Sequence, residues 1–466
     1  MKKFIIFPLL VVASTILYAS CNSMDYNKEM QVPEEMFYNG QYLDAAKLLL
    51  PAVNKKGKDQ LLFMMECGYM LHAGGDTLKS NDVLLPAGKL ARVVPVSITK
   101  QAESLLTNNT ATNYMGEDFE KVLVHMYLGI NFLMNKKHES AGVEFKLVNE
   151  ELEKIRNEGT ESARYKQNIM AKYLTAAAYE ALGNENNDMD DIEYAYKELE
   201  QINSLNPNID FVREDLQRLS KKLGYNDDYA KWVSAFGRRD ISDDSGELVV
   251  IFQSGRNAIK KSRGKILDDK SMNTAINVSF SGMNAKEGVT LGAIIATLQM
   301  AENPIPYFEA RTDVVNSLRI KAGNRAFRTI MLEDISSTAV KNLQDDYTML
   351  KAKVAASIVL KAAISIGAGL AAKEIAKRAG AGSFSGLIGT IAGAGTGAAL
   401  FSSMRPDLRC WHTLPAKLHL GRTFLPPGNH TVKIEYMGGG GFRDVKQQDV
   451  EIKKGEKTFL NIRTLI

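Results

Sequence analysis

The feature that most limits how this chain can fold is a pattern of two helices and a turn at residues 36–46. Gly40 ends an apolar stretch, the aromatic Tyr42 follows two positions later, and Ala45 opens the next apolar face. Glycine permits the tight turn that ends a helix. Tyr42 fills the gap between two paired helices, and Ala45 lets their backbones approach closely. The pattern therefore predicts two antiparallel helices joined by a short turn.

Similar turns recur along residues 33–238, where the sequence is helical in character throughout. One helix begins near Gln60 and ends before a glycine pair, and a later helix is closed by a glycine after an alanine-rich stretch. The recurrence predicts a TPR-like (tetratricopeptide-like) α-helical solenoid with irregular repeat spacing. A plain helical bundle is the alternative. The repeat-turn residues expected to take part in protein binding are Gly40, Tyr42, Ala45, Gly75, Ala141 and Gly183.

Residues 1–20 have the character of a secretory signal peptide, with two lysines before an apolar run from Phe4 to Leu17. At about 14 residues, the run is too short to cross about 30 Å of hydrocarbon. Small residues then lead to Cys21, the arrangement at which bacterial lipoproteins are cut and acylated. We expect lipidation at Cys21 and a flexible tether over 21–32. Cleavage without lipid is the alternative, because Tyr18 departs from the usual motif.

A lipid on Cys21 would hold the mature chain on a membrane of the cell envelope. Asn22 follows the cysteine, so the aspartate that retains enterobacterial lipoproteins at the inner membrane is absent. We therefore expect the outer membrane, with the chain facing the periplasm or the surface. The formal net charge is only +4, which gives no reason to expect nucleic acid as a partner. The expected partners are the membrane and another envelope protein.

The helical pattern gives way to a mixed one over residues 246–345. Glu247 to Phe252 predicts a buried strand, the alternation over 275–280 predicts another, and Gly323–Asn324 predicts the turn of a hairpin. A long helix is expected to begin at Thr338 and to continue to about residue 376. This region should therefore form an α+β domain.

Residues 346–404 are apolar and rich in glycine and alanine. Gly389, Gly393 and Gly397 recur every fourth residue, on one face of a helix, where glycine lets two helices touch. The pattern predicts a hydrophobic helical hairpin. One interpretation is a hairpin packed within or against the protein, which the low leucine content of the second half favours. The other interpretation is a hairpin that enters a membrane through residues 354–403.

Residues 405–466 contain segments in which polar and apolar residues alternate, and a Pro-Pro-Gly sequence precedes the first of them at Gly428. They predict a small C-terminal β-sandwich. The whole chain is thus expected to be an α+β multidomain protein. It would consist of an N-terminal TPR-like solenoid, a central α/β region with the Gly/Ala-rich hairpin, and the C-terminal β-sandwich.

Cys410 and His412 lie two residues apart, so they would share one face of a strand, and His419 and His430 follow in the next segments. A metal site needs three or four such ligands that converge. A Cys–His nucleophile pair needs an orienting acid, for which Asp407 is the neighbouring candidate. Because the spacing matches no known site of either kind, we expect no metal, no cofactor, no small-molecule substrate and no enzymatic activity.

Two charged groups have both a structural and a functional interpretation. Glu117, Asp118 and Glu120 precede an apolar helix, where helix capping is expected and a paired-carboxylate site is the alternative. The basic run from Arg256 to Lys265 is expected to be a solvated loop, with contact to acidic lipid or phosphate as the alternative. Neither group predicts a specific reaction.

A third cluster is expected to be structural. Arg405, Asp407, Arg409 and Trp411 would form a buried ion-pair corner that docks the C-terminal module. Cys67 lies in an apolar helical segment far from Cys410 in the sequence, so buried free thiols are expected in preference to a disulfide.

Several segments, in order, resemble a family of bacterial envelope lipoproteins with tetratricopeptide-like helical repeats and no assigned reaction. The resemblance covers most of the mature chain and implies a lipid-anchored envelope protein. The expected function is a non-enzymatic protein-interaction scaffold, and the alternative is a membrane-inserted or secretion-associated component that uses the hydrophobic hairpin. The matching segments are Tyr38–Tyr42, Asn113–Leu123, Leu248–Phe252 with Gly255, and Asp407–Pro415.

Overall fold

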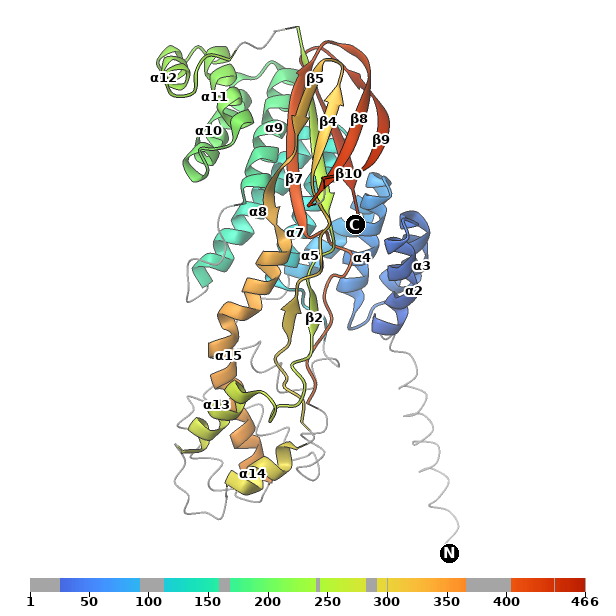
Figure 1. The fold of residues 1–466 in the computed structure, drawn as a ribbon, viewed down its shortest axis with the longest axis vertical. Helices are drawn as coiled ribbons and strands as arrows, with labels where there is room; N and C mark the ends of the chain where they lie inside the picture. The colour runs from blue at the N-terminus through green and yellow to red at the C-terminus, as the bar shows by residue number, and fades with distance from the viewer. Residues whose placement is uncertain are drawn as a thin grey trace, which may run out of the picture.

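The computed structural model describes most of the chain after the predicted leader, and Figure 1 shows its arrangement. Cys21 lies outside the described residues, as does most of the predicted hydrophobic hairpin after Ser365. The described residues are 26–92, 113–158, 168–239, 244–281, 291–299, 301–365, 404–439 and 441–465.

The N-terminal half consists of helices that pack against one another in the order of the sequence. This stack of helical hairpins is the architecture that the repeated turns predict. The helices are α2 (Tyr26–Tyr38), α3 (Tyr42–Asn54), α4 (Gln60–Ala73), α5 (Thr77–Arg92), α7 (Asp118–Met134), α8 (His138–Glu158), α9 (Ile169–Asn186), α10 (Met189–Leu205), α11 (Asp210–Lys222) and α12 (Asn226–Phe236).

Glycines with positive φ make the first turns of the stack, as predicted. Gly40 has a φ of 83° between α2 and α3, and Gly75 has a φ of 84° between α4 and α5. The prediction that Gly183 closes its helix is wrong, because α9 continues to Asn186 and ends at Asn187, with a φ of 53°. Gly183 is needed for space instead, since a Cβ there would lie 2.7 Å from the Asp188 carbonyl oxygen.

The predicted tether over 21–32 is also wrong for the residues that the structure describes. Residues 26–32 belong to α2, because an apolar stripe at helical spacing runs along one face of it. That face is buried against the following repeats. Polar residues that point outward lie between the buried residues in the sequence, so the segment reads as polar overall. The buried members are Tyr26, Met30, Pro33 and Phe37.

The remaining elements of the described residues are strands and three helices. They are β1 (Gly246–Ser254), β2 (Ile259–Lys261), α13 (Lys270–Ser281), α14 (Leu291–Leu298), β3 (Tyr307–Glu309), β4 (Val315–Ala322), β5 (Arg325–Arg328), β6 (Ile330–Asp334), α15 (Ile335–Ser365), β7 (Lys417–Leu425), β8 (Gly428–Gly438), β9 (Gly441–Ile452) and β10 (Lys457–Arg463).

These strands form two four-stranded sheets, in the orders β10-β1-β7-β6 and β5-β4-β8-β9, and a small pair, β2-β3. β1 runs parallel to β10 and antiparallel to β7. The two large sheets pack face to face around an apolar core that includes Val250 from β1, Ile320 from β4 and Ile434 from β8. Figure 1 shows both sheets at one end of the molecule and α15 running to the other end, where α13 and α14 lie.

The predicted division between 246–345 and 405–466 does not separate the strands. Each large sheet contains strands from both ranges, and β1 lies between β7 and β10. The sandwich is therefore one unit built from two distant parts of the chain, not a small C-terminal module. Alternation of polar and apolar residues identifies a strand but does not say which strand lies beside it.

Three further expectations can be compared with the structure. The hairpin turn at Gly323 is confirmed between β4 and β5. The strand expected over 275–280 is wrong, because α13 covers it and buries Met272 and Ile276 at a spacing of four residues. The long helix, α15, begins at Ile335 and is described as far as Ser365. Within the described part of the chain, no helix is long and apolar enough to cross a membrane.

Candidate functional site

The helical repeats enclose an extended segment of their own chain, residues 404–416. Trp411 is fully buried, and its ring lies 6.2 Å from that of Tyr69 and 5.9 Å from that of Tyr127, in both cases edge to face. Aromatic rings prefer such tilted contacts. The segment therefore occupies the inner side of the stack at α4 and α7.

Two buried carboxylates from the helices hold the backbone of this segment. Glu66 of α4 accepts hydrogen bonds from the backbone N–H of His412 at 2.6 Å and that of Thr413 at 3.3 Å. Glu120 of α7 accepts from the backbone N–H of Trp411 at 2.6 Å. Burial raises the pKa of Glu66, and burial together with the nearby Glu117 raises that of Glu120 to about 7.

The carbonyl groups of the segment are held as well. The Tyr26 hydroxyl lies 3.0 Å from the carbonyl oxygen of Cys410, and Tyr38 donates to that of His412 at 2.6 Å. Arg311 also donates to the His412 carbonyl, at 2.8 Å. Side chains of α2, α4 and α7, together with Arg311 from outside the repeats, thus bond backbone donors and acceptors of residues 410–413, and the inner side of α2–α7 holds a non-helical segment of the chain itself.

The predicted repeat-turn residues do not form one surface. Ala45, Ala141 and Gly183 are buried between helices, so a partner cannot contact them directly. Gly40 and Gly75 are exposed at the ends of the first two hairpins, and Tyr42 is half-buried. These six residues shape the stack, and their part in protein binding remains a prediction.

The cysteines and histidines singled out in the sequence do not form a metal site. Cys67 and Cys410 are free, buried thiols, as predicted. His419 lies on β7 and His430 on β8, where His430 contacts the backbone of Pro426. Among the residues that the structure describes, no group of three or more His, Cys, Asp or Glu side chains is arranged to hold a metal ion.

Cys410 and His412 lie close to an acid, although not to Asp407. His412 Nδ1 lies 2.9 Å from Glu34, and despite burial the charges of Cys410 and Glu34 raise the pKa of His412 well above its usual value. Cys410 is only 1% exposed. A nucleophile must reach the atom that it attacks, so the burial of Cys410 argues against covalent catalysis.

A buried Ser–His–Asp group lies at the end of β1, and the sequence does not single it out. Ser254 Oγ is 3.0 Å from His419 Nε2 and 3.3 Å from Asp313. In a catalytic triad the acid contacts the second histidine nitrogen, but His419 Nδ1 has no hydrogen-bond partner among the described residues. Burial lowers the pKa of His419 to about 4, and Ser254 is fully buried. The group is therefore structural.

Helix capping is confirmed for the acidic cluster. Glu117 and Glu120 form a reciprocal capping box at the start of α7. Glu117 also pairs with the buried Lys260.

The basic run that contains Lys260 is not simply a solvated loop, because Arg256 lies 4.1 Å from the centre of the Tyr38 ring and Arg263 lies 4.2 Å from that of Tyr347.

The predicted ion-pair corner is present in part: Asp407 and Arg409 form it, whereas Trp411 packs on Tyr69 and Tyr127. Arg409 contacts Asp59 of the helical half at 2.5 Å and Asp407 at 2.6 Å, and its side chain is buried. Arg405 is exposed. The corner fixes the start of the 404–416 segment to the loop before α4.

A second buried ion network joins the repeats to the sandwich, and no sequence motif predicts it. Arg422 of β7 is 2.9 Å from Asp215 of α11 and 3.3 Å from Glu247 of β1. Lys457 of β10 is 3.0 Å from Glu180 of α9. These residues are far apart in the chain, so only the folded structure brings them together.

Three members of this network, Glu180, Glu247 and Lys457, line a cleft of about 730 Å³ between α9, α11 and α12 and one end of the sandwich. Burial alone would raise the pKa of Glu180, but the charges of Arg218 and Lys457 outweigh it and hold that pKa well below its usual value. Lys221, Lys222 and Arg239 also line the cleft. Its size is typical of ligand sites.

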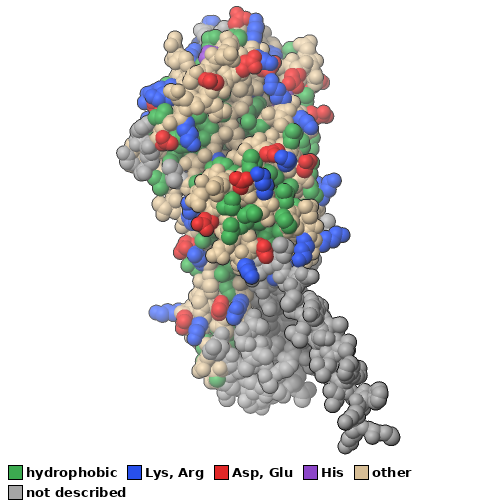
Figure 2. Space-filling model, turned by 90° about the vertical axis from the view of Figure 1, so that its right-hand side faces the viewer, with side chains coloured by type: hydrophobic (Ala, Val, Ile, Leu, Met, Phe, Trp, Pro, Cys, Tyr) green, Lys and Arg blue, Asp and Glu red, His purple; other side chains and the backbone are tan. Residues whose placement is uncertain are grey.

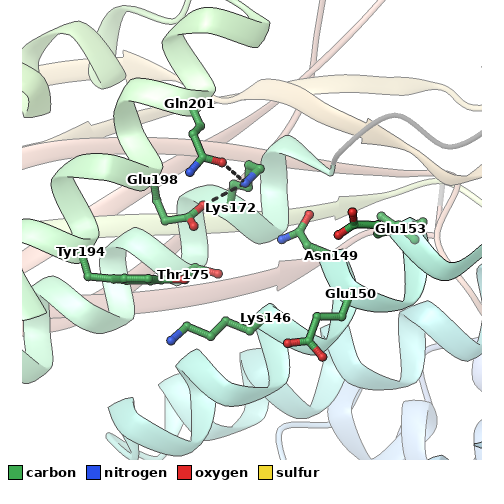
Figure 3. A pocket seen from close by; sticks show the side chains of 10 residues that line it. Lys146, Asn149, Glu150, Glu153, Lys172, Thr175, Tyr194, Glu198 and Gln201 are labelled. Atoms are coloured by element: carbon green, nitrogen blue, oxygen red, sulfur yellow. Dashed lines mark hydrogen bonds and ion pairs between the residues drawn. The ribbon is translucent and has the colours of Figure 1, made fainter. Parts of the chain in front are cut away.

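A smaller pocket, of about 330 Å³, lies between α8, α9 and α10 (Figure 3). Lys172 donates to Glu198 at 3.1 Å and to Gln201 at 2.7 Å. The ammonium group of Lys146 lies 4.2 Å from the Tyr179 ring centre and 4.1 Å from that of Tyr194. Its lysines are thus held by groups of the protein itself, which leaves the larger cleft as the better candidate site.

No protein-family model and no curated protein matches the chain. Among solved structures, the chain is similar to nearly identical TPR-like repeats of a Podosopora anserina protein provisionally named a kinesin light chain. The identity is 15%, and the likeness covers 45% of this chain and 91% of that one, with a TM-score of 0.28. So slight a likeness supports no conclusion about fold or function, which rest here on the contacts described above.

Proposed function

We propose that this protein is a lipid-anchored cell-envelope scaffold that binds other proteins and catalyses no reaction. The observation that carries the proposal is that the stacked hairpins already hold a non-helical segment of polypeptide by the backbone of residues 410–413. Helical repeat stacks offer extended surfaces of this kind to protein partners.

The inner side at α2–α7 is filled, so a partner must bind elsewhere on the repeats. The outer helices offer apolar side chains for this: Leu48 of α3 is 51% exposed and Met189 of α10 is 48% exposed. Figure 2 shows the face that carries α2 and α3, where apolar side chains lie among lysines and acids. Such mixed surfaces are typical of protein interfaces.

The proposed anchor places the repeats close to the membrane. α2 begins at Tyr26, five residues after Cys21, and five residues of extended chain span at most about 18 Å. A lipid on Cys21 would therefore keep the first repeat near the bilayer surface. The leader and the position of Cys21 support export and anchoring, and Asn22 after the cysteine supports the outer membrane.

Photo-crosslinking in the cells that make the protein tests the scaffold proposal. A photoreactive residue is placed at exposed positions of the repeats, Leu48 or Met189, and for comparison at Lys433 on the outer surface of the sandwich. Defined adducts from the repeat positions are the expected result. Adducts from Lys433 alone, or none, would contradict the proposal. Deleting 33–238 is no substitute, because one apolar core includes helices and strands together.

The mature N-terminus tests the anchor. We expect the intact mass to show a chain that begins at an acylated Cys21, and Cys21→Ser to leave the membrane fraction. An unmodified N-terminus, or a Cys21→Ser variant that stays with the membrane, would contradict lipid anchoring.

A further inference from the structure

The cleft between the last repeats and the sandwich has walls from separate parts of the chain. α9, α11 and α12 form one side, and the first residues of β1, the end of β7 and the turn between β9 and β10 form the other. Phe424 and Tyr229 add aromatic surface to it. Sites for small ligands or short peptide segments commonly lie at such junctions.

Three of the four carboxylates that line the cleft pair with a lysine of the protein, and the fourth, Glu185, lies beside His138. These pairs offset part of the positive charge of the cleft, which has more cations than carboxylates in its lining. The contacts are Glu180 and Glu247 with Lys457, Glu456 with Lys136, and Glu185 with His138.

Three cations of the lining have no such partner. No carboxylate of the described residues forms an ion pair with Lys221, Lys222 or Arg239. Lys222 instead donates to the neutral side chain of Asn184. Burial and the nearby charges of Arg218 and Lys457 lower the pKa of Lys222, against the opposite effect of Glu180. The cleft thus has an excess of positive charge that an anionic ligand would relieve.

We infer that this cleft binds an acidic segment of a protein partner, whose carboxylates contact Lys221, Lys222 and Arg239. The inference rests on the proposed scaffold function and identifies the chemistry of the partner. A peptide fits better than a compact anion, because the three cations come from two elements, the end of α11 and the residues after α12. Phe424 and Tyr229 offer apolar contact between such charges.

Fluorescence anisotropy with a labelled hexaglutamate peptide tests the inference, on the purified full-length mature chain with Cys21→Ser. We expect binding that weakens as salt screens the charges. The double variant Lys221→Glu, Lys222→Glu should lower the affinity at least about tenfold. The matched control is Lys89→Glu, an exposed lysine on α5 outside the cleft, which should change the affinity less than about twofold. Equal thermal unfolding of the variants shows that each is folded.

Three outcomes would overturn the inference. The first is equal affinity of the double variant and Lys89→Glu, which places any binding outside the cleft. The second is no binding of the peptide to the unmodified chain. The third is binding of pyrophosphate, lost in the double variant, without binding of the peptide, which assigns the cleft to a small anion. If the peptide does not bind but adducts form at Leu48 or Met189, the scaffold proposal stands without this site. If neither binding nor adducts are observed, the scaffold proposal is contradicted as well.

Discussion

The two faces of the sheet β10-β1-β7-β6 make contacts of different chemistry. On one face, Leu248, Val250 and Phe252 of β1 pack on the second sheet in an apolar core, and the buried Ser254–His419 pair lies at the end of this face. On the other face, Val249 and Ile251 pack on the helical repeats. Glu247 and Gln253 lie at the two ends of this second face.

The helix-facing side carries a polar contact at each end of its apolar centre. Glu247 joins the buried network with Arg422 and Lys457, and Gln253 accepts a hydrogen bond from Tyr69 of α4 at 2.9 Å. Apolar burial has no direction, whereas a buried polar group left without its partner is costly. The centre of the sandwich is therefore held by burial, whereas the polar contacts at both ends of the helix-facing side hold the repeats in one register along β1.

Breaking the polar side should have the largest effect. Arg422→Met removes the cation that faces Asp215 and Glu247 and leaves buried carboxylates short of a partner. We expect the free energy of unfolding to fall by about 3–5 kcal/mol, measured by urea denaturation. Arg319→Met is the control, because that arginine is 44% exposed and 3.8 Å from Glu435 on the sandwich surface; its loss should cost less than about 1 kcal/mol. Similar losses for the two variants would contradict this comparison.

The contact between the repeats and the 404–416 segment should also respond to pH, through Glu120, which accepts a hydrogen bond from the backbone N–H of Trp411. The pKa of Glu120 is raised to about 7 in the folded chain, so the folded state binds its proton more tightly than the unfolded state. Stability from this group is therefore complete below about pH 4.5 and is lost as the pH rises to about 7, by about 3 kcal/mol. Glu120→Gln should remove this fall.

The measurement is the free energy of unfolding between pH 4.5 and 7.5 for the unmodified chain and for Glu120→Gln. The difference between the two curves isolates Glu120 from histidines that titrate in the same range. Glu435→Gln serves as the control, since Lys321 lowers the pKa of this carboxyl on the sandwich, and its stability curve should keep the fall. Parallel curves for the unmodified chain and Glu120→Gln would show that Glu120 does not carry the effect.

Local patterns in the sequence predict what depends on neighbours in the chain. The Gly40 and Gly75 turns, the capping box at Glu117 and the hairpin turn at Gly323 each rest on a few consecutive residues. The ion pair between Arg409 and Asp407 is of the same kind, two residues apart.

What the sequence could not predict depends on partners that are distant in the chain. β1 lies between β7 and β10, two strands that come much later in the chain, and no local alternation encodes that order. The 404–416 segment lies against the repeats because Glu66 and Glu120 bind its backbone there. Glu120 and Trp411 are more than 290 residues apart in the chain. The same holds for the cleft, whose cations come from α11 and from beyond α12.

The smallest predicted effect concerns the apolar parts of both faces. Ile251 faces the repeats and Ile320 faces the sandwich core, and both are fully buried. Ile→Val removes one methylene group, so each variant should lose about 0.5–1.5 kcal/mol in urea denaturation. Since burial is the same on the two sides, the two losses should agree within about 0.5 kcal/mol. A loss at Ile251 that exceeds the loss at Ile320 by more than about 1 kcal/mol would mean that the polar contacts also constrain the apolar packing beside them. The polar ends and the apolar centre of the helix-facing side would then not act independently.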